Sequence, residues 1–177
     1  MTDITTLEYQ QKNKPKIEDV IPEILKDNVK ETALAFVAHL RENKMSPGWA
    51  GYHNAWDAKC KGKTICKVRL GADYKETVNI NGNWNITLYL KNTKKYENTI
   101  FEENLQNCIL DNVRLCISCG TCAPEEKNVI FLGKEIKGVC RHTYNQIRFR
   151  NPNVSDINKI KRLLELEKKA RAEIAIK

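Results

Sequence analysis

Four of the seven cysteines lie in one segment, where Cys116, Cys119 and Cys122 are spaced at Cys-x2-Cys-x2-Cys and Cys140 follows later. Thiolates are the ligands that zinc and other soft or borderline metal ions prefer, and a Cys-x2-Cys turn presents two of them together. The intervening residues 128–139 have the pattern of a β-hairpin that turns at Gly133-Lys134. Such a hairpin would return Cys140 to the first three thiols, so segment 116–142 predicts one metal centre.

Tetrahedral zinc bound by four thiolates is the simplest form of this centre. Gly120 directly follows the second cysteine and allows the turn to close with its amides near sulfur. His142 is an alternative fourth ligand if Cys122 points away. The competing interpretation is a set of free thiols in a reducing compartment, but three cysteines at two-residue gaps favour metal. The predicted ligands are Cys116, Cys119, Cys122 and Cys140.

The heptapeptide Cys116–Cys122, CISCGTC, resembles the first three ligands of a bacterial ferredoxin. The resemblance implies an iron–sulfur protein for electron transfer or redox sensing, with a [4Fe-4S] cluster that Cys140 would have to complete. In that family a fourth cysteine, followed by proline, comes shortly after the third. Glu126 occupies that position here, and the second ferredoxin motif is missing. This departure favours zinc over iron–sulfur.

A second resemblance extends over much more of the chain and is to a group of clostridial proteins of unknown function. It implies a bacterial cytoplasmic protein and no particular activity. The stretches that carry it are 44–47, 62–66, 84–86, 111–113, 116–122, 133–135 and 151–153.

The length of 177 residues and the mixed composition predict one globular domain over 17–177, preceded by a flexible N-terminal arm over 1–16. No apolar stretch approaches the length of a membrane span, and residues 1–16 are too polar for a signal peptide, so we expect a cytoplasmic protein. No nucleophile motif, phosphate-binding loop or His-Glu-x2-His array is present. The sequence therefore favours a non-catalytic role in binding a small ligand or a protein partner.

Hydrophobic periodicity predicts an α+β fold in which an antiparallel sheet of three to five strands carries helices on one face. The Cys-rich hairpin and a C-terminal helix complete it. Asn28 and Glu31 resemble a capping box, and Ser155 is the expected cap of the last helix. Its apolar stripe predicts either docking on the sheet or a homodimer seam. The expected helices cover 17–26, 28–43, 100–113 and a segment from 155 onward, and the expected strands 52–60, 63–70, 84–90 and 146–150.

The first three expected strands each place their apolar side chains at even-numbered positions. These faces coincide in an antiparallel pair only if the numbers of paired residues sum to an even value. The turn around Gly62 should therefore contain an odd number of residues, and we expect three. Cys60 can then face Cys66, and we interpret both as small core residues.

Two surfaces have the composition of binding sites. Trp49, Tyr52, Trp56 and Trp84 could line a small-molecule pocket, although tryptophans at strand alternation are more often core residues. The net charge of +8 and the basic, aromatic stretch after Cys140 are compatible with nucleic-acid binding beside a zinc knuckle, or with a solvated strand. The basic residues of that stretch are Arg141, Arg148 and Arg150.

Overall fold

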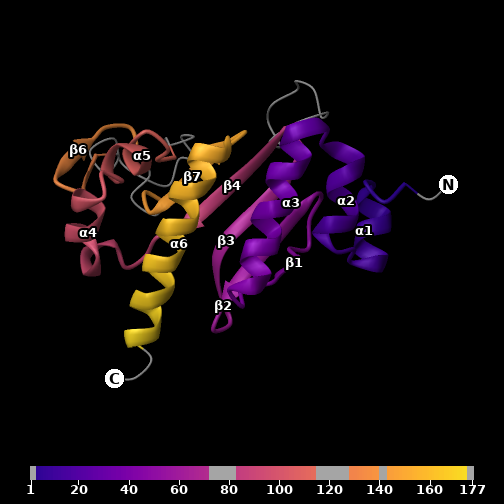
Figure 1. Cartoon of the computed structure of the whole chain (residues 1–177), viewed down its shortest axis with the longest axis horizontal. Coiled ribbons are helices and arrows are strands. Elements are labelled where there is room, and N and C mark those ends of the chain that lie inside the picture. Colours follow the sequence, from indigo (N-terminus) through magenta and orange to yellow (C-terminus); the bar gives the residue numbers. More distant parts are fainter. Residues whose placement is uncertain (1–2, 72–82, 115–127, 140–142, 175–177) are drawn as a thin grey trace.

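The structure is a computed structural model that describes residues 3–71, 83–114, 128–139 and 143–174 (Figure 1). Seven strands and six α-helices occur in these ranges. The strands are β1 (Pro47–Trp49), β2 (Ala55–Cys60), β3 (Lys63–Leu70), β4 (Trp84–Tyr89), β5 (Val129–Phe131), β6 (Lys134–Ile136) and β7 (Gln146–Arg150). The helices are α1 (Leu7–Asn13), α2 (Ile17–Ile24), α3 (Asp27–Glu42), α4 (Glu97–Glu102), α5 (Gln106–Leu110) and α6 (Val154–Ile174), with a 3-10 turn at Thr93–Lys95.

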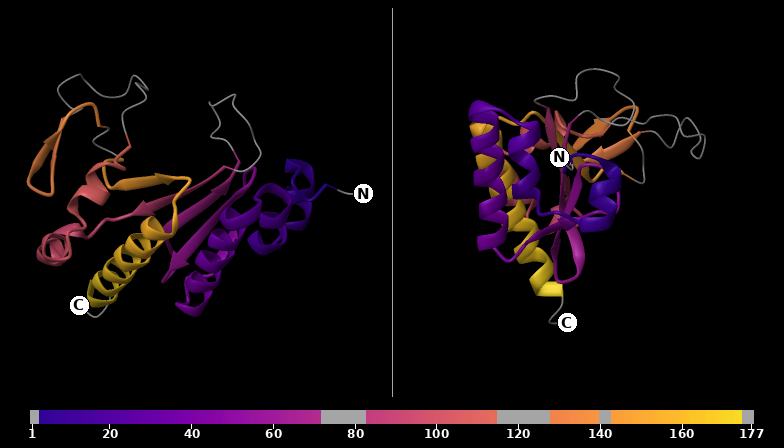
Figure 2. Two further views of the ribbon diagram at one scale, coloured as in Figure 1. Left: turned by 45° about the horizontal axis from the view of Figure 1, so that its top comes forward. Right: turned by 90° about the vertical axis from the view of Figure 1, so that its right-hand side faces the viewer.

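Five strands form one antiparallel sheet in the order β1-β2-β3-β4-β7, and β5 and β6 form a separate hairpin. Helices α3 and α6 lie side by side against one face of the large sheet, while the β5–β6 hairpin lies on the other side of it (Figure 2). The α+β class, the antiparallel sheet and the C-terminal helix are confirmed. The hairpin at 129–136 is also present, but it turns at Leu132-Gly133, both with positive φ.

The core forms where one face of the sheet meets the helices, with even-numbered residues of β2, β3 and β4 and odd-numbered residues of β7 on that face. Trp56 pairs with Val68, Val68 with Ile86 and Ile86 with Phe149, and all four side chains are buried. Phe36 of α3 packs edge-to-face on Trp84, with ring centroids 6.3 Å apart. The apolar stripe of α6 is buried in this same core, as the docking alternative predicts. The even-numbered pairing of the strands is therefore confirmed.

The connection between β2 and β3 meets this pairing rule in a way that differs from the expected three-residue loop. Lys61 and Gly62 form a two-residue turn with φ of 49° and 76°, the left-handed backbone that suits the twist of a hairpin. This turn pairs Cys60 with Lys63, an even-numbered residue with an odd-numbered one. If that register continued along both strands, their even-numbered faces would not meet. A β-bulge between Ala58 and Lys59 absorbs one residue of β3, so Ala58 pairs with Cys66.

Helix ends differ from the predictions because tertiary contacts set them. Helix α3 begins at Asp27, and no side chain caps it, so the capping box at Asn28 and Glu31 is wrong. The predicted helix over 100–113 is two short helices, with Asn104 between them at a φ of 55°. Helix α6 begins at Val154, and the side chain of Asn153, not Ser155, accepts from its first turn.

The predicted N-terminal arm over 1–16 contains helix α1. Thr6 caps the helix, and Gln10 lies fully buried at its centre. The Gln10 amide donates to Asn54 Oδ1 at 2.5 Å, and its Oε1 accepts from the Asn54 backbone N–H at 2.9 Å. This two-way pairing ties the helix to the start of β2.

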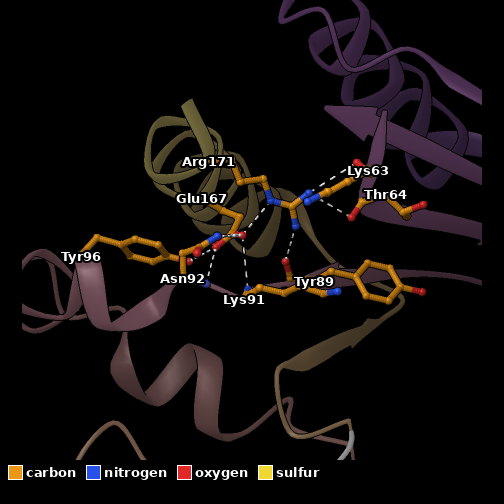
Figure 3. A network of polar contacts seen from close by, with 8 residues as sticks. All are labelled: Lys63, Thr64, Tyr89, Lys91, Asn92, Tyr96, Glu167 and Arg171. Atoms are coloured by element: carbon orange, nitrogen blue, oxygen red, sulfur yellow. Dashed lines mark hydrogen bonds and ion pairs between the residues drawn. The ribbon is translucent and has the colours of Figure 1, made fainter. Parts of the chain in front are cut away.

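A buried carboxylate fastens α6 to the end of β4 (Figure 3). Glu167 has no exposed surface and accepts from the Tyr96 hydroxyl at 2.7 Å, from two backbone amides and from the Asn92 side chain. Arg171, one helical turn on, pairs with Glu167 at 2.8 Å and donates to the carbonyls of Thr64 and Tyr89. The Glu167 carboxylate, the Arg171 guanidinium and the Tyr96 hydroxyl thus each have specific hydrogen-bond partners in this cluster.

Candidate functional site

The predicted metal ligands Cys116, Cys119, Cys122 and Cys140, the alternative ligand His142, and the predicted nucleic-acid residue Arg141 lie outside the described residues. Within the described ranges, no three metal-binding side chains of His, Cys, Asp or Glu come together. The three described cysteines are free thiols. Burial raises the pKa of the Cys66 thiol far above its usual range and that of Cys108 to about 11, so both stay protonated.

The chain on either side of the two cysteine-bearing stretches is held at one edge of the sheet. Val113 forms a β-bridge with Ile147, and the Arg114 guanidinium donates to Gln146 Oε1 at 3.0 Å. The hairpin is anchored as well, since Gln106 donates to the Leu132 carbonyl at 2.7 Å. The described residue that precedes Cys116 therefore lies beside the strand that follows Cys140.

The sheet separates the four aromatic residues of the predicted pocket. Trp56 and Trp84 are 0% and 1% exposed in the core, and Trp49 pairs directly with Trp56 on the same face. Tyr52 lies on the opposite side, where its hydroxyl accepts a hydrogen bond from Lys67. The structure thus places Trp56 and Trp84 in the core and a partly buried Trp49 against it, while Tyr52 is exposed on the opposite side.

The face of the sheet opposite α3 and α6 is polar and carries charged residues on three strands. One row across it pairs Asp57 with Lys67, Lys67 with Thr87 and Thr87 with Arg148. The adjacent row pairs Arg69 with Asn85 and Asn85 with Arg150. We call this surface the polar face; it comprises Asp57, Lys67, Arg69, Asn85, Thr87, Tyr89, Gln146, Arg148 and Arg150.

Positive charge dominates the polar face. Burial, followed by repulsion from Arg69, Arg148 and Arg114, lowers the pKa of the Lys67 ammonium. The carboxylate on this face is Asp57, 3.5 Å from the Lys67 nitrogen, and burial raises its pKa. Like charges have therefore been brought close enough to disfavour one another, which is a feature of binding sites for the opposite charge.

Tyr52 lies beneath two of these cations. The Lys67 nitrogen is 4.6 Å and the Arg69 Cζ 5.9 Å from the centre of its ring. A ring face attracts cations, so Tyr52 holds both long side chains over the sheet.

Between the cations of β3 and those of β7 runs a neutral stretch of β4. Thr87 is 3% and Asn85 8% exposed, and neither side chain has a hydrogen-bond partner among the described residues. Burial also raises the pKa of Tyr89, the next residue on this side of the strand, so its hydroxyl stays neutral and able to donate.

Sequence reasoning identified Arg148 and Arg150 as candidates but missed Lys67, Arg69 and Thr87. A signal was available, because polar and apolar residues alternate along 66–70, β4 and β7, with the polar ones at odd positions of β3 and β4 and at even positions of β7. Only the pairing of strands far apart in the sequence shows that these positions share one face.

Comparison with protein families, with curated proteins and with solved structures finds no match to this chain. Among the described helices, none combines the length and the apolar character that a membrane crossing requires.

Proposed function

We propose that this is a non-catalytic binding protein whose segment 116–142 holds one structural zinc ion, with Cys116, Cys119, Cys122 and Cys140 as ligands. The supporting observation is the contact between Arg114 and Gln146 at 3.0 Å. Cys116 is two residues from Arg114 and Cys140 three residues before Thr143, whose carbonyl accepts from Gln146 at 2.8 Å. Extended chain spans at most about 3.5 Å per residue, so these short sequence separations allow both thiols to reach the same edge of the sheet.

A reducing compartment such as the cytoplasm suits this proposal, because zinc requires thiolates that are not oxidised to disulfides. The ion would stabilise the segment locally, since the buried core of the sheet and helices is built without it. Small-ligand binding would then fall to the polar face of the sheet.

Metal analysis of anaerobically purified protein tests the zinc site. We expect one zinc ion per chain, and we expect Cys119→Ser to lower both the zinc content and the temperature of thermal unfolding. Cys108→Ser is the matched control, because it removes a described thiol of α5 that belongs to no group of three or more metal-binding side chains among the described residues. Unchanged zinc stoichiometry in Cys119→Ser would contradict the ligand assignment.

The ferredoxin-like spacing supports a second candidate, a [4Fe-4S] cluster in the same segment. It predicts a brown protein that contains iron and sulfide and whose visible absorption bleaches on reduction. A colourless protein that contains zinc excludes this candidate.

A further inference from the structure

One histidine lies where the two helices that cover the sheet meet. His39 is in the last turn of α3, and α3 lies beside α6 (Figure 2). The Nε2 atom of this ring has no exposed surface and no hydrogen-bond partner among the described residues. Buried polar side-chain atoms usually have a partner, so the ring is an exception that calls for an explanation.

The other ring nitrogen faces a hydrogen-bond donor. The side-chain amide nitrogen of Asn43 donates to the His39 carbonyl at 2.9 Å, and the same nitrogen lies 3.3 Å from His39 Nδ1. Nδ1 is therefore the acceptor, and Nε2 carries the proton of the neutral ring. A second proton would bind at Nδ1 and point at the Asn43 amide group. Protonation of the ring therefore breaks this contact, or the bond between the amide and the carbonyl.

Asn43 also connects this part of α3 to α6. Its backbone carbonyl accepts a hydrogen bond from the Lys168 ammonium at 2.6 Å. The C-terminal end of a helix favours a positive charge, but Lys168 already supplies one here. An imidazolium at His39 would add a second cation beside it, and the two would repel each other.

The charged groups that act on the ring come from the two helices. They are Lys161, Glu165 and Lys168, which follow one another at helical spacing on α6, and Glu42 on α3. Burial is the largest effect and lowers the pKa of His39. Repulsion by the two lysines adds to it, and attraction by the two carboxylates offsets part of it.

Helix α2 and strand β1 also pack on α3. Strand β1, Pro47–Trp49, has no titratable side chain. The α2 carboxylates Glu18 and Asp19 act on Arg41 of α3 instead of on the imidazole. The response of the ring to acid is therefore set at the contact between α3 and α6.

We propose that His39 makes the α3–α6 contact sensitive to acid, so that protonation of its ring loosens α6 from the end of α3. The neutral ring fits this contact and the imidazolium does not. Because the pKa is lowered in the folded state, the stabilisation is complete above the unfolded-state value of about 6.5 and is lost as the pH falls below it. This response requires neither zinc nor a ligand, so it is independent of the proposed function.

Hydrogen exchange of the full chain, followed by mass spectrometry at a pH of about 7.5 and of about 5.5, tests the proposal. The wild type is compared with His39→Gln, whose side chain does not titrate. We expect equal exchange at the higher pH. At the lower pH we expect residues 161–171 of α6 to exchange about threefold faster or more in the wild type, with β3 unchanged. Comparison at equal pH cancels the titration of other groups and any loss of metal.

His53→Gln is the matched control. It removes the other described histidine, whose Nε2 has a partner in the Thr5 carbonyl oxygen at 2.6 Å. This variant should exchange over 161–171 as the wild type does at both pH values.

The wild type alone provides a second test, which is informative even if His39→Gln does not fold. The ring resonances of the histidines are followed by NMR against pH, in the folded protein and again in urea. We expect the His39 ring to titrate at a lower pH in the folded protein than in the unfolded chain.

Equal exchange of the wild type and His39→Gln at the lower pH overturns the proposal, as does faster exchange spread evenly over the whole chain. A folded His39 ring that titrates at or above its value in urea also overturns it, because the contact would then favour the charged ring. The same holds if His53→Gln, and not His39→Gln, removes the response to acid.

Discussion

The Tyr96–Glu167 contact shows what one buried polar pair contributes at the scale of single residues. The Tyr96 hydroxyl donates to a carboxylate with no exposed surface, at 2.7 Å. We expect Tyr96→Phe to lower the free energy of unfolding by about 1.5–3 kcal/mol, the usual range for hydrogen bonds to charged groups. Urea denaturation at pH 7 measures it. Tyr9→Phe, whose hydroxyl has no hydrogen-bond partner among the described residues, should change little.

The same pair predicts a pH dependence. Burial and the adjacent Glu167 raise the pKa of Tyr96 above its ordinary value of 10.0. A raised pKa in the folded state means that the stabilisation is complete below the unfolded-state pKa and is lost as pH rises beyond it. The stability difference between wild type and Tyr96→Phe should therefore be constant up to about pH 9 and shrink above pH 10.

Residue roles were predictable where a pattern repeats and not where a partner is distant. Strand alternation predicted that the large apolar side chains of Trp56 and Trp84 lie in the core, and both are buried there. Glu167 looks like any other polar residue of a basic helix. Its importance depends on Tyr96 and Asn92, which lie more than 70 positions away.

The start of α6 is the clearest test at the scale of an element. Asn153 Oδ1 accepts from the Asp156 backbone N–H at 3.0 Å, and Asp156 Oδ2 accepts from the Asn153 N–H at 3.1 Å. Removing such a reciprocal cap costs about 1 kcal/mol, so we expect that loss in Asn153→Ala. Ser155→Ala should stay within about 0.5 kcal/mol of the wild type in urea denaturation. An equal loss in both would contradict the assigned cap.

Elements were predicted well and their ends poorly, for a physical reason. Alternation over β3 and β4 reflects burial of one face, and burial is a strong signal in the sequence. The end of an element depends on which nearby group satisfies its backbone. The β2–β3 connection illustrates this, because a two-residue turn with a bulge and a three-residue turn satisfy the same pairing rule.

At the scale of the whole molecule, the N-terminal helix is part of the domain. Gln10 fills a buried site against Asn54, whose backbone has a φ of 51° and whose side chain is buried too. We expect Gln10→Ala to cost about 2 kcal/mol or more, since two buried polar groups lose their partner. The exposed neighbour Gln11→Ala is the control. A negligible loss of unfolding free energy in Gln10→Ala, measured by urea denaturation, would support the prediction of a flexible N-terminal arm.

The architecture was predicted because one rule, the meeting of even-numbered faces, fixes the layers of the sheet and its helices. The polar face was not predicted, because it needs the pairing of β7 with β4 across more than 50 residues of intervening chain. The thiol cluster is the reverse case. Three of its four cysteines, Cys116, Cys119 and Cys122, lie close together in the sequence, so their spacing alone suggests the site, and its ligand set remains a prediction.

All three tryptophans of the chain belong to β1, β2 and β4, and two of them, Trp56 and Trp84, are buried in the core. No indole is present beyond residue 84. The intrinsic fluorescence of this protein is consequently a spectroscopic report on the helix-covered layer. If the cysteine segment holds zinc as proposed, its removal by a chelator should leave the emission maximum unchanged, whereas unfolding of the core should shift it to the red.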